Sequence, residues 1–447
     1  MTLKSRYAEL MGLYAGKKGV WGTGSAKPTG TVLTSEVVDL ILAEAVVGRA
    51  SDIHIEPRPS GFKIRLRVDG KLYESLDIAN APELNIVPRL KILAGLPTDA
   101  GSSRKAWDGR FSMKIGEGSY DFRIATFPTL LGEKVAIRIL NKDSGLMNLK
   151  RIGLNPQDLL HLERIIQRKS GLFVVSGPTS AGKTTTLYSM LRFLPAQVLN
   201  IVTLEDPVEY QIDGINQCDV KTKTDGDFAS GLKAVLRQDP DVILIGEIRD
   251  AESAEIAVQA SITGHLVLTS LHANSAAGIF MRLVNMGIEK HLVAFALTGA
   301  MAQRLVPRVC ESCRVPHKID AQGLNRICIS CGIDPKLFVS AQNSGEGEVH
   351  DLTAENEKLP AETVFYKGKG CERCAGTGYR GRIGIFEIIQ FTEELREAIL
   401  HDANSAEIEN IAMAGGYRSL AVDAIQKAKA GLVTLDDIYP ILLEKSS

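Results

Sequence analysis

One eight-residue segment, Gly177-Pro-Thr-Ser-Ala-Gly-Lys-Thr184, constrains the fold of this chain more than any other feature. It fits the pattern GxxxxGK[ST], follows an apolar run from Leu172 to Ser176, and precedes a stretch with helical periodicity. Glycines let successive backbone N–H groups turn toward bound phosphates, and the start of the following helix adds its dipole. The order strand, loop, helix is the context that confirms the motif. The segment therefore predicts a phosphate-binding loop (P-loop) in an α/β fold.

Two side chains of this segment are expected to take part in phosphate binding. The ammonium of Lys183 would reach the β and γ oxygens of a nucleoside triphosphate, and the hydroxyl of Thr184 would hold Mg²⁺. A glycine-rich loop that matches by chance is the alternative, and the correct order of strand, loop and helix argues against it. We expect ATP and Mg²⁺ as cofactors. The residues expected to bind them are Gly177, Pro178, Thr179, Ser180, Ala181, Gly182, Lys183, Thr184 and Thr185.

An acidic residue, Glu247, follows the apolar run Val242 to Ile245 after one glycine. In open α/β sheets ligands bind at the carboxyl ends of the strands, so a carboxylate there faces the ligand. It could orient the attacking water or complete the Mg²⁺ shell. A strand end that is merely solvated is the simpler alternative, and four consecutive apolar residues in a P-loop protein argue against it. We predict that Glu247 makes hydrolysis possible.

Four short apolar segments alternate with helical stretches in the middle of the chain. They run from Leu172 to Ser176, Ile201 to Leu204, Val242 to Ile245 and Leu266 to Leu268. Such nearly continuous apolar runs are typical of parallel strands that are buried on both faces. The fold class predicted here is therefore α/β.

The segment before this sheet has a different pattern. Apolar residues at helical spacing (Val37, Val38, Ile41, Leu42 and Ala45) precede two pairs of alternating segments. One pair turns at Asp69-Gly70 and the other lies within residues 109–127, which predicts two hairpins in an α+β domain. A polar stretch at 341–358 reads as a mobile loop. The expected divisions are a tail over 1–30, an N-terminal α+β domain over 31–148, and an α/β domain over 149–447 with a cysteine-rich module over 308–382 and C-terminal helices over 383–447.

Composition excludes several classes of protein. The 447 residues are 45% hydrophobic and 23% charged, which is ordinary for a globular protein. The formal net charge of -1 provides no global field for nucleic acid, so a dedicated DNA binder is disfavoured. The N-terminus lacks the pattern of a secretory signal, and no run approaches the roughly 18 apolar residues of a spanning helix. We expect a cytosolic protein whose membrane contact comes from partners.

Six of the seven cysteines form three CxxC pairs, Cys310/Cys313, Cys328/Cys331 and Cys371/Cys374. Without an export signal, this spacing favours metal over disulfides, and tetrahedral zinc needs two pairs. The neighbouring pairs at 310–331 would make a plausible zinc ribbon, and spacing alone leaves the choice of pairs open. Reduced cysteines without metal are the alternative. Cys218 is expected to be a buried, inert thiol.

Two further segments carry a resemblance to a known family. Thr203 to Glu209 gathers three acids after a strand, and Thr263 to Asn274 places histidines at both ends of the next strand. The chain resembles the ATPases of type II secretion and type IV pilus assembly (the GspE/PilB group), in which these segments are the Asp box and the His box. The resemblance extends from Ser35 to the C-terminus. The other matching segments are SDIHIEP at 51–57, IRLRVDG at 64–70, RLKILAGL at 89–96, GEKVAIRIL at 132–140, AQRLVPRVC at 302–310 and GYRGRIGIFE at 378–387.

The resemblance implies a RecA-like P-loop domain preceded by a smaller α+β (PAS-like) domain, and it implies roles for the box residues. Glu205, Asp206 and Glu209 match acids expected near the metal and the attacking water. His265 and His272 match positions expected to sense the γ-phosphate or to link subunits. Taken singly, a histidine is more often a satisfied structural residue.

The resemblance also implies arginine and zinc sites. Arg123, Arg138 and Arg237 match arginines thought to meet the nucleotide when the N-terminal domain closes on the P-loop domain. A surface ion pair is the alternative for Arg123 and Arg138. Lys233 stands where the family usually has an arginine, and the stretch after Leu96 matches only in part. The family's zinc ligands correspond to Cys310, Cys313, Cys371 and Cys374.

The function implied is an ATP-hydrolysing motor. We expect a homo-hexamer attached peripherally to the inner membrane through a polytopic platform protein, and possibly a second docking protein, that powers assembly of a pilus or pseudopilus. The cofactors would be ATP, Mg²⁺ and Zn²⁺, and no nucleic acid is expected. Assembly is favoured over retraction because retraction motors lack the cysteine module. The alternatives are a DNA-uptake pilus ATPase, a nucleic-acid translocase gripping DNA by a zinc ribbon, and a nucleotide-regulated scaffold with little turnover.

Overall fold

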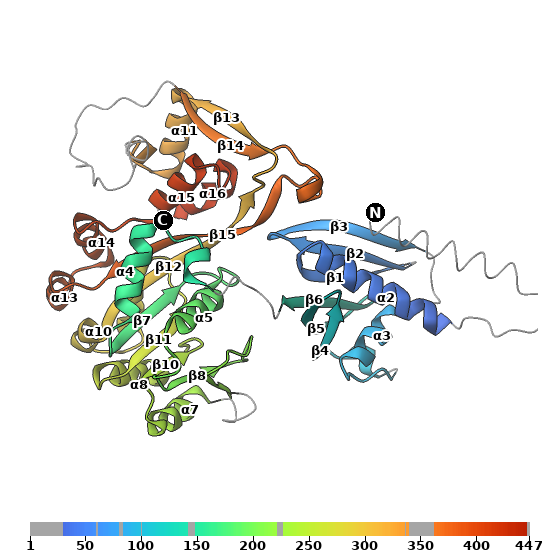
Figure 1. Cartoon of the computed structure of the whole chain (residues 1–447), viewed down its shortest axis with the longest axis horizontal. Helices are drawn as coiled ribbons and strands as arrows, with labels where there is room; N and C mark the ends of the chain where they lie inside the picture. Colours follow the sequence, from blue (N-terminus) through green and yellow to red (C-terminus); the bar gives the residue numbers. More distant parts are fainter. Residues whose placement is uncertain are drawn as a thin grey trace, which may run out of the picture. The chain divides into compact units, whose positions relative to one another are not determined.

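The computed structural model describes residues 30–59, 61–79, 84–99, 101–141, 148–220, 227–335, 337–338 and 362–444. The chain divides into two compact units, residues 1–144 and 145–447. Figure 1 shows their helices and strands. The polar stretch at 341–358 lies outside the described residues, and so does the expected tail except for Gly30, which begins a helix.

The first unit is a helix-covered antiparallel sheet. The strand order is β3-β2-β1-β6-β5-β4. Helix α2 buries Val37, Val38, Ile41, Leu42 and Ala45 against it. The elements are α2 (Gly30–Val47), β1 (Ala50–Arg58), β2 (Gly61–Val68), β3 (Lys71–Ala79), α3 (Ile86–Leu93), β4 (Trp107–Ile115), β5 (Gly118–Thr129) and β6 (Gly132–Asn141).

Both predicted hairpins are present in this sheet. Strands β2 and β3 pair from Val68 opposite Lys71, so Asp69 and Gly70 form a two-residue turn. Both turn residues have positive φ, 49° and 87°, as the turn that matches strand twist requires. The second hairpin joins β4 to β5. The α+β class predicted for this part of the chain is confirmed.

The second unit is built on a seven-stranded sheet of order β15-β12-β7-β11-β10-β8-β9. The four predicted apolar strands are β7, β8, β10 and β11, and they run parallel. Every residue of these four strands is buried. The strands are β7 (Gly171–Ser176), β8 (Ile201–Glu205), β9 (Asn216–Asp219), β10 (Val242–Ile245), β11 (Leu266–Leu271), β12 (Leu297–Val309) and β15 (Tyr379–Gln390). The predicted α/β class with a parallel sheet is confirmed.

Helices cover both faces of this sheet, and successive strand residues point alternately to the two faces. Leu172 and Val174 join one apolar cluster, while Phe173 and Val175 join the other. Cys218 of β9 is only partly buried, so the prediction of a buried thiol is wrong because β9 is the edge strand. The covering helices are α4 (Pro156–Ile166), α5 (Lys183–Phe193), α7 (Phe228–Val235), α8 (Ala251–Ile262), α9 (Ala276–Asn285) and α10 (Lys290–Ala296).

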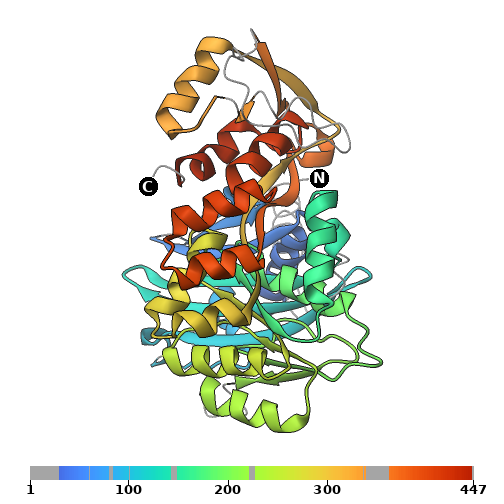
Figure 2. The same ribbon diagram turned by 90° about the vertical axis from the view of Figure 1, so that its left-hand side faces the viewer.

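The cysteine-bearing module lies between the antiparallel strands β12 and β15 in the chain. It contains β13 (Arg314–Asp320), α11 (Ala321–Cys331) and β14 (Glu362–Gly368), and β13 pairs with β14. Helices α15 and α16 lie between this ribbon and the β12–β15 edge of the sheet (Figures 1 and 2). The C-terminal helices are α13 (Glu393–Leu400), α14 (Ser405–Ala414), α15 (Leu420–Lys429) and α16 (Leu435–Leu443).

A buried ion pair fixes α15 to β15. Lys427 Nζ lies 2.5 Å from Asp423 Oδ2 and donates to Gly384 O at 2.7 Å. The same carboxylate oxygen accepts from the backbone N–H of Phe386 at 2.8 Å. Burial raises the pKa of Asp423 and lowers that of Lys427, and the pairing opposes both shifts. Each charge is therefore tolerated in the core only because the other is present.

We expect Lys427→Met to lower the free energy of unfolding of the second unit by about 3–5 kcal/mol, because it leaves the Asp423 carboxylate buried and unpaired. Urea unfolding followed by far-UV circular dichroism measures this, since both tryptophans, Trp21 and Trp107, precede the second unit. Lys290→Met is the matched control, because Lys290 pairs with Asp402 on the surface and its loss should change little. A Lys427→Met protein as stable as wild type would contradict this account.

Candidate nucleotide and metal sites

The P-loop lies between the end of β7 and the start of α5. Gly177 and Gly182 adopt φ of 152° and 90°, and Gly182 is the residue before the first helical residue, Lys183. Lys183 Nζ donates to Gly177 O at 2.6 Å and to Pro178 O at 3.2 Å, so its ammonium lies over the loop. Thr184, in the first turn of α5, is exposed. The segment therefore has the local geometry that phosphate binding requires.

Gln303 of β12 braces this loop from the neighbouring strand. Its Nε2 donates to Ala181 O at 2.7 Å, and its Oε1 accepts from Thr186 Oγ1 at 2.8 Å. A Cβ added at Gly177 would lie 2.5 Å from Gln303 O, so only glycine fits there. Sequence reasoning assigned no role to Gln303, and its only signal was its place in the matching segment AQRLVPRVC.

Glu247 lies at the carboxyl edge of the sheet, just after β10. Its Oε1 accepts from Arg249 Nε at 2.5 Å, and its Oε2 lies 3.7 Å from His272 Nε2. The guanidinium of Arg249 also lies 3.7 Å from Asp206 Oδ2. The structure thus places Glu247, His272 and Asp206 near one another, and it adds Arg249, to which the sequence analysis assigned no role.

The P-loop lysine belongs to the same electrostatic environment. Burial lowers the pKa of Lys183, Glu247 acts in the opposite direction, and Arg304 adds to the lowering. Lys183 and Glu247 therefore interact across the space at the strand ends, where open α/β sheets bind ligands. This arrangement supports phosphate binding beside a carboxylate, and the catalytic role of Glu247 stays a prediction.

Glu205 occupies a different environment, because its side chain is buried in the protein. It accepts from Thr203 Oγ1 at 2.6 Å, from Gln217 Nε2 at 3.3 Å and from the hydroxyl of Tyr188. Burial raises the pKa of Glu205 despite these donors. The Tyr188 oxygen also accepts from the backbone N–H of Glu209 at 3.2 Å. These contacts give Glu205 a part in positioning α5 and the Asp206–Glu209 segment, and its predicted catalytic role is untested.

His265 and Arg237 lie at the opposite edge of the sheet from the P-loop. Register pairs Leu266 with Gly171 at the start of β7, and Leu271 with Ser176 at its end. A six-residue strand spans roughly 17–20 Å, so His265 is about that far from the P-loop. Its Nδ1 lies 3.0 Å from Ala260 O, and Arg237 is exposed before β10 begins. His265 and Arg237 therefore lie far from the P-loop of their own chain, and a role for either residue at a nucleotide stays a prediction.

Arg123 and Arg138 are neighbours on β5 and β6 in the first unit, where they stand opposite each other. Arg138 Nε lies 3.2 Å from Asp52 Oδ1, so the surface ion pair considered as the alternative is present for this residue. Lys233, the departure from the family, pairs with Glu252 at 2.6 Å on the surface. A role for Arg123 and Arg138 at the nucleotide stays a prediction.

Four cysteines form a cluster with the geometry of a tetrahedral metal site. The Sγ atoms of Cys310, Cys313, Cys371 and Cys374 all lie within 4.8 Å of one another. The Cys310–Cys371, Cys313–Cys374 and Cys371–Cys374 separations are 3.9, 3.8 and 3.7 Å. Four sulfurs at 2.3 Å from a central zinc would be about 3.8 Å apart.

The remaining pair does not take part in this cluster. Cys328 and Cys331 lie three residues apart on α11 and face the apolar core, with exposed fractions of 2% and 0%. The local ribbon of residues 310–331 is therefore not formed. Burial disfavours the Cys374 thiolate, but backbone N–H groups of Cys371 and Gly378 outweigh it and the pKa falls to about 6. A sulfur held as thiolate is suited to bind a metal.

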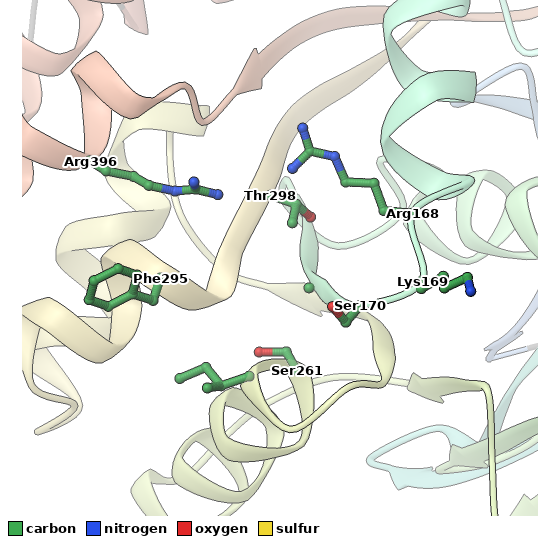
Figure 3. A pocket seen from close by; sticks show the side chains of 9 residues that line it. Arg168, Lys169, Ser170, Ser261, Phe295, Thr298 and Arg396 are labelled. Carbon is green, nitrogen blue, oxygen red and sulfur yellow. The ribbon is translucent and has the colours of Figure 1, made fainter.

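A cavity of about 420 Å³ lies at the amino edge of the sheet (Figure 3), on the side of His265 and away from the P-loop, Glu247 and the cysteine cluster. Arg168 and Lys169, before β7, line it together with Arg396 and Phe295. The C-terminal ends of α4, α8 and α10 lie here, and cations stabilise such ends. The cavity is thus distinct from the P-loop, which lies at the carboxyl edge.

Comparison with known proteins identifies the family. The sequence profile described as "Type II/IV secretion system protein" matches residues 29–440. The chain belongs to this family. The type II secretion system protein E of Pseudomonas aeruginosa is 38% identical over 409 residues, covering 92% of this chain and 75% of the relative. The type IV pilus assembly ATPase PilB of Myxococcus xanthus is 40% identical over 405 residues, covering 90% of this chain and 67% of the relative.

Solved structures support the fold of this secretion ATPase. The Legionella pneumophila ATPase DotB matches with a TM-score of 0.65 at 20% identity, covering 91% of this chain and 95% of DotB. The pilus retraction motor PilT matches with a TM-score of 0.57 at 23% identity, covering 90% of this chain and 95% of PilT. The predicted family and enzyme class, an ATPase of the secretion and pilus type, are confirmed. Over the part of the chain that the structure describes, no helix is long and apolar enough to cross a membrane.

We expect Gly177→Ala to lower ATP turnover by at least ~10²-fold, because moving the P-loop by about an ångström to relieve the clash with Gln303 O would misplace the phosphates. Gly287→Ala is the control, since Gly287 also has a positive φ, 98°, but has nothing within 4 Å of an added Cβ. Steady-state phosphate release from both variants measures the difference. Equal turnover in the two variants would show that the Gln303 contact does not shape the loop.

Proposed function

We propose that this secretion ATPase is the motor of a pilus or pseudopilus assembly machine and works as a hexameric ring. The observation that carries the proposal is the P-loop with Glu247 beside it, in a chain related to both protein E of type II secretion and PilB. The near-neutral net charge of -1 favours a protein partner over nucleic acid. A polytopic inner-membrane platform protein, and a second docking protein, are the partners proposed.

ATP binding would begin at the P-loop backbone. Lys183 now donates to Gly177 O and Pro178 O, and its ammonium would exchange these carbonyls for β and γ phosphate oxygens. Thr184, exposed in the first turn of α5, is the residue that would hold Mg²⁺, which would neutralise charge on the phosphates. Gln303 keeps the loop in place through Ala181 O during this exchange.

Hydrolysis would use Glu247 to orient the attacking water. Arg249 and His272 contact its two oxygens and fix the direction of the carboxylate. Asp206 and Glu209 would complete the acidic surroundings of the metal and the water. Arg237 and His265, at the other edge of the sheet, would act on the nucleotide of a neighbouring subunit. Arg123 and Arg138 would approach the phosphates when the first unit closes on the second.

We expect Glu247→Gln to bind Mg·ATP normally while hydrolysis falls by at least ~10²-fold, because a positioned base contributes at least that much. The variant should also accumulate as an ATP-loaded ring, which sedimentation in the presence of ATP detects. Phosphate release and equilibrium ATP binding are measured on one preparation.

Lys183→Ala is the comparison variant, because it removes charge facing the phosphates and should weaken binding itself. Near-normal turnover in Glu247→Gln would move catalysis to another acid, Glu205 or Glu209. Stimulation of wild-type turnover by DNA, but not by the platform protein's cytoplasmic domain, would favour the nucleic-acid translocase.

We further propose that the four-cysteine cluster holds one zinc ion. The fit rests on four sulfurs at separations close to those of tetrahedral zinc and on the amide donors that favour the Cys374 thiolate. Zinc would tie the end of β12 at Cys310 to the turn before β15 at Cys374, and so hold the base of the module. A structural site of this kind contributes folding energy rather than chemistry.

We expect about one zinc per chain, released by Cys371→Ser or Cys374→Ser and retained by Cys328→Ser or Cys331→Ser. The outer pairs bind metal, while the α11 pair is buried in the core. Elemental analysis of the four purified variants measures this. Loss of zinc from Cys328→Ser with retention in Cys371→Ser would contradict the assignment.

A further inference from the structure

The guanidinium of Arg304 is buried next to Gln303, the residue that braces the P-loop, and has no assigned role in ATP binding or hydrolysis. Arg304 follows Gln303 on β12, and its side chain is 8% exposed. Its Nε and NH2 donate to Glu444 Oε2 at 2.9 and 2.5 Å. Glu444 follows the last residue of α16, so this contact joins the C-terminal helices to the sheet. A buried arginine with one carboxylate partner is costly to separate from it.

The other donors of Arg304 reach two segments of the nucleotide site. NH1 donates to Gln303 O at 3.1 Å. The same oxygen is the atom that a Cβ added at Gly177 would approach to 2.5 Å. NH2 also donates to Asn274 O at 3.0 Å, in the loop that carries His272. His272 in turn faces Glu247. One side chain thus holds the brace of the P-loop and the loop beside the catalytic carboxylate.

We propose that Arg304 is a positioning residue of the nucleotide site, and that Glu444 at the end of α16 sets the positive potential at the P-loop by partly neutralising Arg304. This inference rests on the nucleotide site proposed above. It gives the C-terminal helices an electrostatic connection to ATP, through a residue that touches no phosphate. A partner that binds α16 and displaces Glu444 would therefore change nucleotide affinity.

The charges of Arg304 and Glu444 determine whether nucleotide binding becomes tighter or weaker when either residue is changed. Arg304 lowers the pKa of Lys183, so its positive charge is felt at the ammonium that meets the phosphates. Removing the charge of Glu444 would leave Arg304 in place, because Gln303 O, Asn274 O and a glutamine oxygen at 444 can still accept from it. The potential at the P-loop would rise and anionic nucleotides would bind more tightly. Removing Arg304 would do the reverse.

The test uses the full-length chain and Mg·ADP, whose binding is measured by calorimetry at low and high salt. Glu444→Gln should tighten ADP binding about two- to fivefold at low salt, and high salt should reduce the effect. Arg304→Gln should weaken ADP binding and raise KM for ATP. The double variant should match Arg304→Gln, because the proposed effect of Glu444 on nucleotide binding passes through Arg304.

Asp402→Asn is the matched control, since Asp402 is another acid of the C-terminal region and pairs with Lys290 on the surface. It should leave ADP affinity unchanged. Weaker or unchanged binding in Glu444→Gln, or additive effects in the double variant, would overturn the proposal. So would a lower melting temperature in both single variants with unchanged affinity, which a purely structural role predicts. If Arg304→Gln fails to fold, the direction of the change in ADP affinity in Glu444→Gln still tests the proposal. Retained binding in Lys183→Ala would instead refute the nucleotide site itself.

Discussion

The pairing of β12 with β7 is the constraint on which the rest of the second unit depends. Register places Ala302 opposite Ser176, the residue before the P-loop. The next residue of β12, Gln303, is thereby carried to the level of the loop, and Arg304 follows it. A slip of one residue would exchange the two faces of β12 and remove both contacts. The geometry of the P-loop is therefore fixed by a neighbouring strand as well as by its own sequence.

The same strand connects the nucleotide site to the cysteine cluster. β12 pairs with β15 along most of its length, and Cys310 follows directly after β12 ends. Strand β15 in turn holds the C-terminal helices through Glu387, which accepts from Ala276 N, Tyr417 OH and Leu420 N. Because Ala276 begins α9, one buried carboxylate joins three elements. Burial raises the pKa of Glu387, and these donors oppose the shift.

Local sequence predicted those parts of the fold that local interactions determine. The Asp69-Gly70 turn, the four buried strands and the strand, loop and helix of the P-loop each follow from residues that are close in the chain. The cysteine site could be predicted only through the family, because Cys313 and Cys374 are 61 positions apart and meet through the pairing of β12 with β15. Gln303 was missed for the same reason, since its partners Thr186 and Ala181 lie more than a hundred positions away.

The two edges of the sheet divide the predicted site residues, and this division bears on the ring. Glu247, His272 and Lys183 lie at the carboxyl edge, and His265 and Arg237 at the amino edge. A strand's length of roughly 17–20 Å separates them, which exceeds the reach of any side chain. If residues at both edges of one chain act on nucleotide, they must act on two different nucleotide molecules. A role for Arg237 or His265 in hydrolysis would therefore need a second subunit.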